Sequence, residues 1–135
     1  MSQLIIAELL ESRLALWAEA QGLPVAYENI AFNPSDGPYL ESHVMPATTE
    51  AIDLSRQAKV MRGVYQVNVV VPAGDGKSDA GRIADGIIET FPEGQEMSDG
   101  ELTCYINSVP SAFPAITSDI NYTVPVSMSY RADIS

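Results

Sequence analysis

A change of hydrophobic period between residues 63 and 91 gives the strongest structural signal in the chain. Apolar and polar residues first alternate, with one side formed by Tyr65, Val67, Val69 and Val71. This period of two predicts a half-buried strand that ends at Pro72, because proline cannot donate to a strand ladder. After a turn at 74–76, apolar residues recur at steps of three and four, at Ala80, Ile83, Ala84, Ile87, Ile88 and Phe91. This spacing predicts an amphipathic helix that ends before Pro92, and the strand and helix together predict the nucleus of a core.

The same patterns predict the remaining regular elements. A second helix is expected over residues 3–20, because apolar residues cover about half of its circumference and Gly22 and Pro24 follow it. Further strands are expected at residues 25–32, 39–45, 101–107 and 121–131. Cys104 falls on the apolar side of its strand and is expected to be a small core residue.

Several segments lack a regular period. Residues 93–100 are polar and predict a turn, and residues 109–117 contain two prolines and predict a connection or a broken edge. Pro125 interrupts the last strand, which indicates an edge position or a bulge. Residues 46–60 have no clean period, so we expect a surface loop or a hairpin arm that projects from the sheet.

These elements predict a single α+β domain over residues 1–135. We expect a mixed or mainly antiparallel sheet of about four to six strands, with two helices packed on its apolar face. The other face of the sheet is polar but largely uncharged, which suits either water or a subunit contact.

Four basic residues are candidates for a subunit interface. At 100° per residue, Arg13 falls inside the apolar arc of the first helix. Either its stem packs and its head reaches water, or another subunit covers it and supplies a carboxylate. Arg56, Lys59 and Arg62 lie close together and are three of the 7 basic residues of the chain. They belong either to a solvated loop or to a basic contact for an acidic neighbour.

The charge of the chain excludes several classes of partner. There are 7 Lys and Arg against 18 Asp and Glu, and the net charge is -11. Such a chain repels phosphate, so neither sequence-independent nucleic-acid binding nor binding to an anionic membrane surface is expected. The first residues do not resemble a signal peptide, and no apolar run approaches the roughly 20 residues of a membrane span.

Motifs for catalysis or cofactor binding are not evident. Gly76-Lys77-Ser78 resembles part of a phosphate-binding loop, but Val71 stands where that motif requires its first glycine. His43 is the only histidine, and nothing near it in the sequence indicates a nucleophile–base pair. With a lone cysteine and no metal-ligand spacing, we predict no catalytic residue, no cofactor and no metal site. The residue chemistry thus favours a binding or structural module over an enzyme.

Three segments resemble the tail terminator proteins of long-tailed bacteriophages. They are Ala-Leu-Trp-Ala at 15–18, GVYQVNVVVPAGDGKSDAGRIADGIIETF at 63–91, and YTVPVSMSYRAD at 122–133. The resemblance covers most of the chain and is weakest over residues 33–60. Its motifs are structural and not catalytic.

The resemblance implies a structural role in the phage tail. It implies a six-membered ring of identical copies that caps the head-proximal end of the tail tube, stops polymerisation and offers the surface that joins the head. The implied partners are the tail tube protein and a head-completion or connector protein, with DNA only passing through the lumen. The implied location is the virion tail, after assembly in the bacterial cytoplasm.

Two alternatives stay open at this point. A head–tail connector or tail completion protein from the same particle would bind the portal side and would not cap a tube. A small-ligand-binding α+β domain would require a deep pocket, lined for example by His43 and convergent carboxylates.

Overall fold

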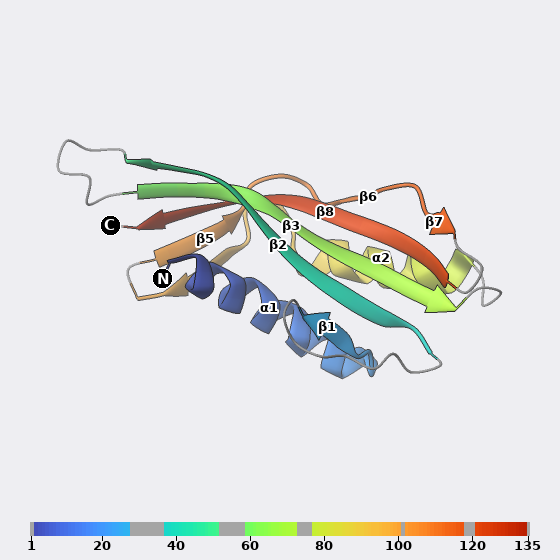
Figure 1. Ribbon diagram of the computed structural model, residues 1–135. Helices are drawn as coiled ribbons and strands as arrows, with labels where there is room; N and C mark the ends of the chain where they lie inside the picture. Colours follow the sequence, from blue (N-terminus) through green and yellow to red (C-terminus); the bar gives the residue numbers. More distant parts are fainter. Residues whose placement is uncertain are drawn as a thin grey trace.

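The computed structural model describes residues 2–27, 37–51, 59–72, 77–100, 102–117 and 121–134. These residues form two helices and eight strands (Figure 1). In chain order they are α1 (Ser2–Gln21), β1 (Val25–Tyr27), β2 (Tyr39–Ala51), β3 (Lys59–Pro72), α2 (Lys77–Thr90), β4 (Glu96–Asp99), β5 (Leu102–Ile106), β6 (Ser111–Ala112), β7 (Ile116–Thr117) and β8 (Asn121–Ile134).

All of the strands belong to one mixed sheet. The order across the sheet is β1-β2-β3-β8-β5-β4, and the two-residue strands β6 and β7 also pair with β8. Only β1 and β2 run parallel among the described pairs. The structure therefore confirms the α+β class and the mixed sheet. Two short strands join the six-stranded path, so the sheet is larger than the sequence predicted.

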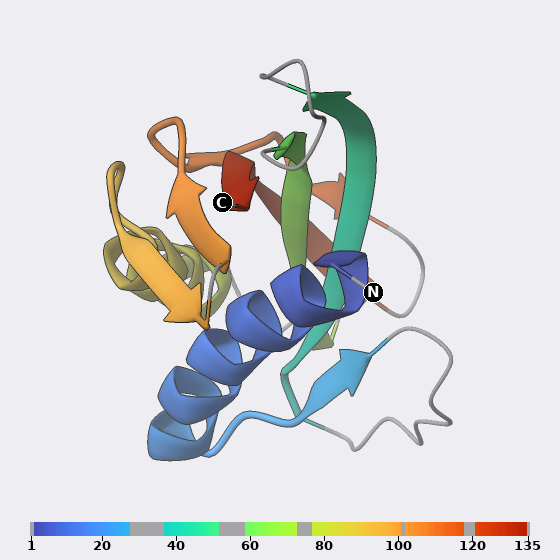
Figure 2. The same ribbon diagram turned by 90° about the vertical axis from the view of Figure 1, so that its left-hand side faces the viewer.

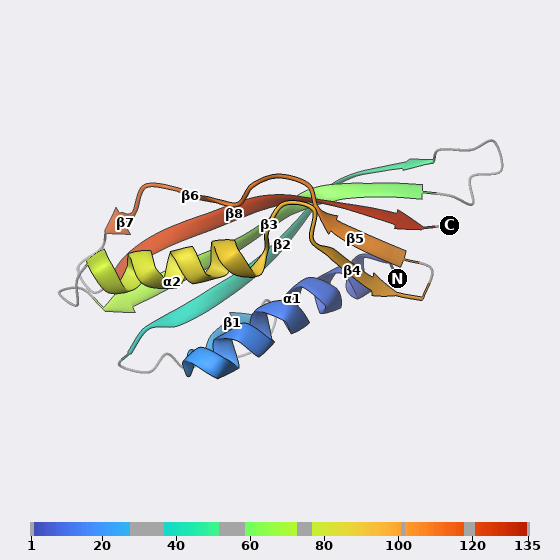
Figure 3. The same ribbon diagram turned by 180° about the vertical axis from the view of Figure 1, so that it is seen from behind.

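The sheet curls, and the two helices contact different parts of it. Figure 3 shows α2 lying along β3 and β8, which it contacts, whereas α1 contacts β4, β2 and β5. In Figure 2 the sheet bends so that β5 and β2 stand on either side of α1. This arrangement does not confirm the expected pair of helices on one face, because a curled sheet has no single flat face for both.

Both helices and the long strands contribute to one hydrophobic core. The predicted apolar side of β3 is fully buried, since Tyr65, Val67, Val69 and Val71 are each 0% exposed. Cys104 is buried beside them, as predicted. The alternation in the sequence thus identified the core face of the sheet correctly, because burial of one face requires a period of two.

Two predictions about local structure are wrong. Residues 96–99 form strand β4 and not a turn; this edge strand has three exposed residues, and only Met97 is buried. Pro125 marks neither an edge strand nor a bulge, because β8 pairs with β3 in a continuous register in which Pro125 faces Asn68.

The position of Pro125 has a geometric explanation. Its carbonyl oxygen accepts a hydrogen bond from the backbone N–H of Phe113, on the side of β8 away from β3. In an antiparallel ladder the N–H and C=O of one residue point to the same side, so the missing N–H also faces that side. There, residues 113–115 between β6 and β7 form no strand. A central strand therefore accommodates the proline, because Pro125 lies at the gap between the pairings of β8 with β6 and with β7.

The strands β2 and β3 form the longest hairpin of the sheet. They pair from Tyr39 and Val70 at one end to Ala51 and Lys59 at the other, with a shift of register between Pro46 and Thr48. The paired ends at Ala51 and Lys59 extend beyond the helices in Figure 1. Of the segment 46–60 expected as a loop or hairpin arm, residues 46–51 belong to β2 and residues 59–60 to β3, and residues 52–58 lie outside the described residues. Residues 28–32 of the expected strand 25–32 also lie outside them.

Candidate functional site

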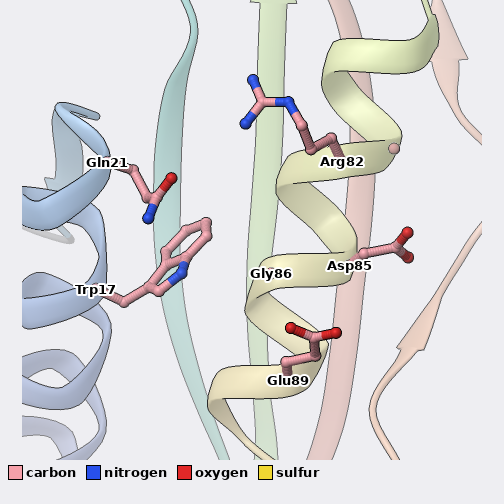
Figure 4. Close-up of a pocket in the computed structure, with 7 residues that line it drawn as sticks. Trp17, Gln21, Arg82, Asp85, Gly86 and Glu89 are labelled. Carbon is pink, nitrogen blue, oxygen red and sulfur yellow. The ribbon is translucent and has the colours of Figure 1, made fainter.

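The two helices meet where the indole ring of Trp17 lies against Gly86 of α2. A methyl group on Gly86 would come within 2.4 Å of the Trp17 ring, so only glycine permits this approach. Beside the contact is an open groove of about 670 Å³ between α1 and α2 (Figure 4). Its lining residues are Trp17, Gln21, Gly81, Arg82, Asp85, Gly86 and Glu89.

The groove carries more negative than positive charge. Asp85 and Glu89 contribute two carboxylates, and Arg82 contributes one guanidinium group. The Arg82 side chain is 67% exposed and lies 3.7 Å from a carboxylate oxygen of Asp79, one turn earlier in α2. Within the described part of the chain, neither Asp85 nor Glu89 forms an ion pair. The groove therefore combines an aromatic wall with uncompensated acidic charge.

Arg13 joins α1 to the end of α2. Its Nε–H donates a hydrogen bond of 2.6 Å to the backbone carbonyl oxygen of Thr90, the last residue of α2. Its guanidinium carbon lies 5.9 Å from the centroid of the Phe91 ring. A cation is favourable at this position because the carbonyl groups at a helix C-terminus carry partial negative charge. The sequence predicted water or another subunit for this side chain, and the structure provides an intramolecular partner; a further role of Arg13 in a subunit contact stays a prediction.

A second polar link joins α1 to the sheet through a buried serine. Ser42 is 0% exposed, and its hydroxyl donates to a carboxylate oxygen of Glu11 at 2.8 Å. Because that hydroxyl has one proton, the Tyr65 hydroxyl, also at 2.8 Å, must be the donor to Ser42. Burial raises the pKa of Tyr65 above its usual value, the hydrogen bond with Ser42 opposes this effect, and the charge of Glu11 adds to it. Tyr65 therefore stays protonated and donates.

A third feature is an exposed apolar segment on β6, β7 and the residues beside them. Val109, Phe113 and Ile116 are 63%, 50% and 64% exposed. From Asn107 to Thr117 the sequence contains no charged residue. We name residues 107–117 the apolar edge. The sequence predicted only a connection or broken edge here, from Pro110 and Pro114, although the absence of charged residues is a signal of this surface.

The structure separates the residues that the sequence proposed as interface candidates. Arg62 is partly exposed on β3 and pairs with Thr48 of β2 and Arg131 of β8. Arg13, in contrast, is a residue of α1 whose side chain contacts the C-terminal end of α2. Lys59 begins β3 and its backbone pairs with Ala51. Arg56 lies outside the described residues. The only histidine, His43, is partly exposed on β2 opposite Gln66 and lines none of the described pockets.

The described residues also bear on metal binding and on membrane spans. Among the described residues, no group of three or more His, Cys, Asp and Glu side chains is arranged to hold a metal ion. Within the described part of the chain, neither α1 nor α2 is both long and apolar enough to cross a membrane.

The chain is similar to known proteins over nearly its whole length. A solved structure without a functional name is 39% identical and matches with a TM-score of 0.83, covering 100% of this chain and 96% of its own. No curated protein matches significantly. The family model of the phage tail terminator protein matches residues 5–130. The chain therefore belongs to the phage tail terminator family and has a structural role in a phage tail.

Proposed function

We propose that six copies of this protein form a ring on the head-proximal end of the tail tube, where the ring ends tube polymerisation and provides the surface that joins the head. The protein acts in this proposal as a structural component and not as an enzyme. Assembly takes place in the cytoplasm of the bacterial host. The tail tube protein and a head-completion or connector protein are the partners.

The apolar edge is the observation that carries this proposal. Three large apolar side chains, those of Val109, Phe113 and Ile116, are at least half exposed along one short segment. Exposed apolar patches on soluble proteins commonly mark contacts with other proteins. The chain carries a net charge of -11, so identical copies repel one another wherever charged surfaces meet. The uncharged apolar edge offers a surface on which this repulsion is least.

The position of the apolar edge favours a ring over a two-fold dimer. In Figure 1, β7 lies near one end of the elongated sheet, and the paired ends of β2 and β3 lie at the other. A contact between two different ends of a molecule is heterologous, and repeating it produces a closed ring when the rotation closes. The excess of acidic residues suits a lumen that DNA crosses, because acidic walls add no phosphate contacts that retain it.

The first test is the length of tails in particles produced without this gene, measured by electron microscopy. Overlong tubes without heads are expected if the protein ends polymerisation. Tubes of normal length that fail to join heads would instead assign the protein to the connectors. Normal infectious particles would contradict both roles.

A second test addresses the apolar edge directly. The variant Phe113→Asp places a charge on the edge without removing a core side chain, and we expect it to restore tail length poorly in particles that lack the wild-type gene. Leu16→Asp is the matched control, because Leu16 is also exposed, at 73%, but lies on α1. Full activity of both variants would remove the apolar edge from the assembly surface.

A further inference from the structure

The groove between α1 and α2 has the chemistry of a site for a cationic side chain. In Figure 4 the Trp17 ring forms one wall, and the carboxylate of Glu89 extends from the facing helix. An indole ring is the best aromatic partner for a cation, and a neighbouring carboxylate adds a charge-assisted hydrogen bond. Asp85 lies one turn from Glu89 on α2 and lines the same groove.

The local charges leave this site available. The one guanidinium group that lines the groove, that of Arg82, is exposed and lies 3.7 Å from a carboxylate oxygen of Asp79, which is not part of the groove lining. Glu89 and Asp85 form no ion pair with any other described residue. Glycine is also less favourable than alanine in the interior of a helix, so the presence of Gly86 in α2 needs a reason. Its presence is explained by the close approach of Trp17, which gives the groove its aromatic wall.

The same chain contains a basic segment that complements the groove. Arg56, Lys59 and Arg62 make up three of the 7 basic residues of an otherwise acidic protein. The strands that lead to this segment end, in Figure 1, on the side of the molecule opposite α2. Lys59, which begins β3, is therefore remote from the groove of its own molecule, and the next copy in a head-to-tail arrangement is the one that can supply this contact.

We propose that the Trp17–Glu89 groove of one copy binds the basic segment 56–62 of the next copy in the ring. This inference rests on the proposed self-assembly and adds a charged contact between copies to the apolar edge. An arginine side chain stacks on Trp17 and donates to Glu89, and the lysine adds charge at the rim near Asp85. Repulsion between acidic copies is then offset at each interface by the few basic residues that the chain has.

A binding experiment tests the groove without requiring the ring. Trp17 is the only tryptophan in the chain, so its fluorescence reports on the groove alone. The full-length protein is titrated with a synthetic peptide of residues 50–64, and the control peptide carries glutamine in place of Arg56, Lys59 and Arg62. We expect a saturable change in emission that weakens about tenfold with the control peptide or with the Glu89→Gln protein. Glu96→Gln, at an exposed position outside the groove, is expected to bind like the wild type.

A charge exchange tests the same contact in the assembled tail. Glu89→Arg and Lys59→Glu with Arg56→Glu are each expected to reduce infectious particles at least tenfold when they replace the wild-type protein. Combining the changes is expected to restore most of the loss, because the pair of charges is exchanged and not removed. Normal particles from the separate variants, or a combined loss without restoration, would overturn the groove proposal. Overlong tubes without the gene would leave the terminator role intact in that event, so the two failures are distinguishable.

Discussion

The Nε–H of Arg13 donates a hydrogen bond to the backbone carbonyl oxygen of Thr90, which lies 77 residues later in the chain. This single contact fixes the middle of α1 to the end of α2, and the guanidinium group also lies over Phe91. Phe91 in turn meets Tyr65 of β3 edge to face, with their ring centroids 5.7 Å apart. The contact between the helices is thus continuous with the core of the sheet.

Replacing Arg13 tests this connection. Arg13→Met keeps much of the apolar stem but removes the charged donor, so we expect the free energy of unfolding to fall by about 2 kcal/mol. Arg82→Met is the control, because Arg82 is exposed and its ion pair with Asp79 is expected to contribute less than about 1 kcal/mol. Urea denaturation followed by circular dichroism measures both. Equal effects of the two changes would contradict a specific role for the Thr90 contact.

Two glycines of α2 provide a matched pair. In Gly86→Ala the new methyl group would collide with Trp17, whereas in Gly81→Ala no heavy atom lies within 4 Å of it. Alanine is the better helix former by about 1 kcal/mol, so Gly81→Ala should raise stability. Gly86→Ala should lower it by about 1–3 kcal/mol, because overpacking outweighs the gain in helix propensity. Thermal unfolding gives the sign of each change, and a shift of both in the same direction would argue against the packing of Trp17.

Tyr65, Ser42 and Glu11 are linked by two hydrogen bonds, and we expect substitutions of Ser42 and Tyr65 to lower the free energy of unfolding by different amounts. Ser42→Ala leaves the buried Tyr65 hydroxyl without this acceptor, which costs about 1–3 kcal/mol. Tyr65→Phe leaves Ser42 still bonded to Glu11, so it should cost less. The double variant is expected to be more stable than the sum of the two losses predicts. Ser12→Ala, at an exposed position of α1, is the control. Strict additivity of the two losses in the double-mutant cycle would contradict the coupling of the two hydrogen bonds.

Cys104 predicts a loss of stability in alkaline solution. Burial raises the pKa of its thiol from 9.0 to about 12 in the folded protein. Between these values the unfolded state has released a proton that the folded state retains, so stability falls as the pH rises. Relative to pH 7, the wild-type protein should lose about 1 kcal/mol more than Cys104→Ala by pH 10. The cavity created by alanine affects both pH values equally, so an unchanged difference between the proteins would contradict the raised pKa.

The sequence predicted the elements whose residues alternate between a buried and an exposed side. Tyr65 and Val67 are fully buried on the predicted side of β3, and the helical period before Phe91 corresponds to α2. Local pattern is sufficient here because burial of one face imposes its own period on the sequence. The edge strand β4 has no alternating pattern of apolar residues in its sequence, because it buries only Met97.

The candidate site depends on contacts that a local pattern does not contain. Gly86 is an ordinary helix glycine in the sequence, and only its approach to Trp17 from another helix explains it. The partner of Arg13 is a backbone carbonyl, which has no signature in the identity of Thr90. At Pro125 a local rule misled the prediction. Proline usually marks an edge strand or a bulge, but here a central strand tolerates it because the side of β8 away from β3 is only partly paired.

The central place of β8 in the sheet has a consequence for the order of events during synthesis. This strand is the last of the ten described elements to be translated, yet it lies between β3 and β5 and pairs with β3 along 14 residues. The earlier segments cannot complete their core until residues 121–134 have been made, and such long-range pairings form slowly. A nascent or truncated chain therefore lacks the finished sheet and the surfaces that depend on it. If the protein ends tube growth as proposed, only complete molecules would cap a tail, and incomplete copies would not cap it too early.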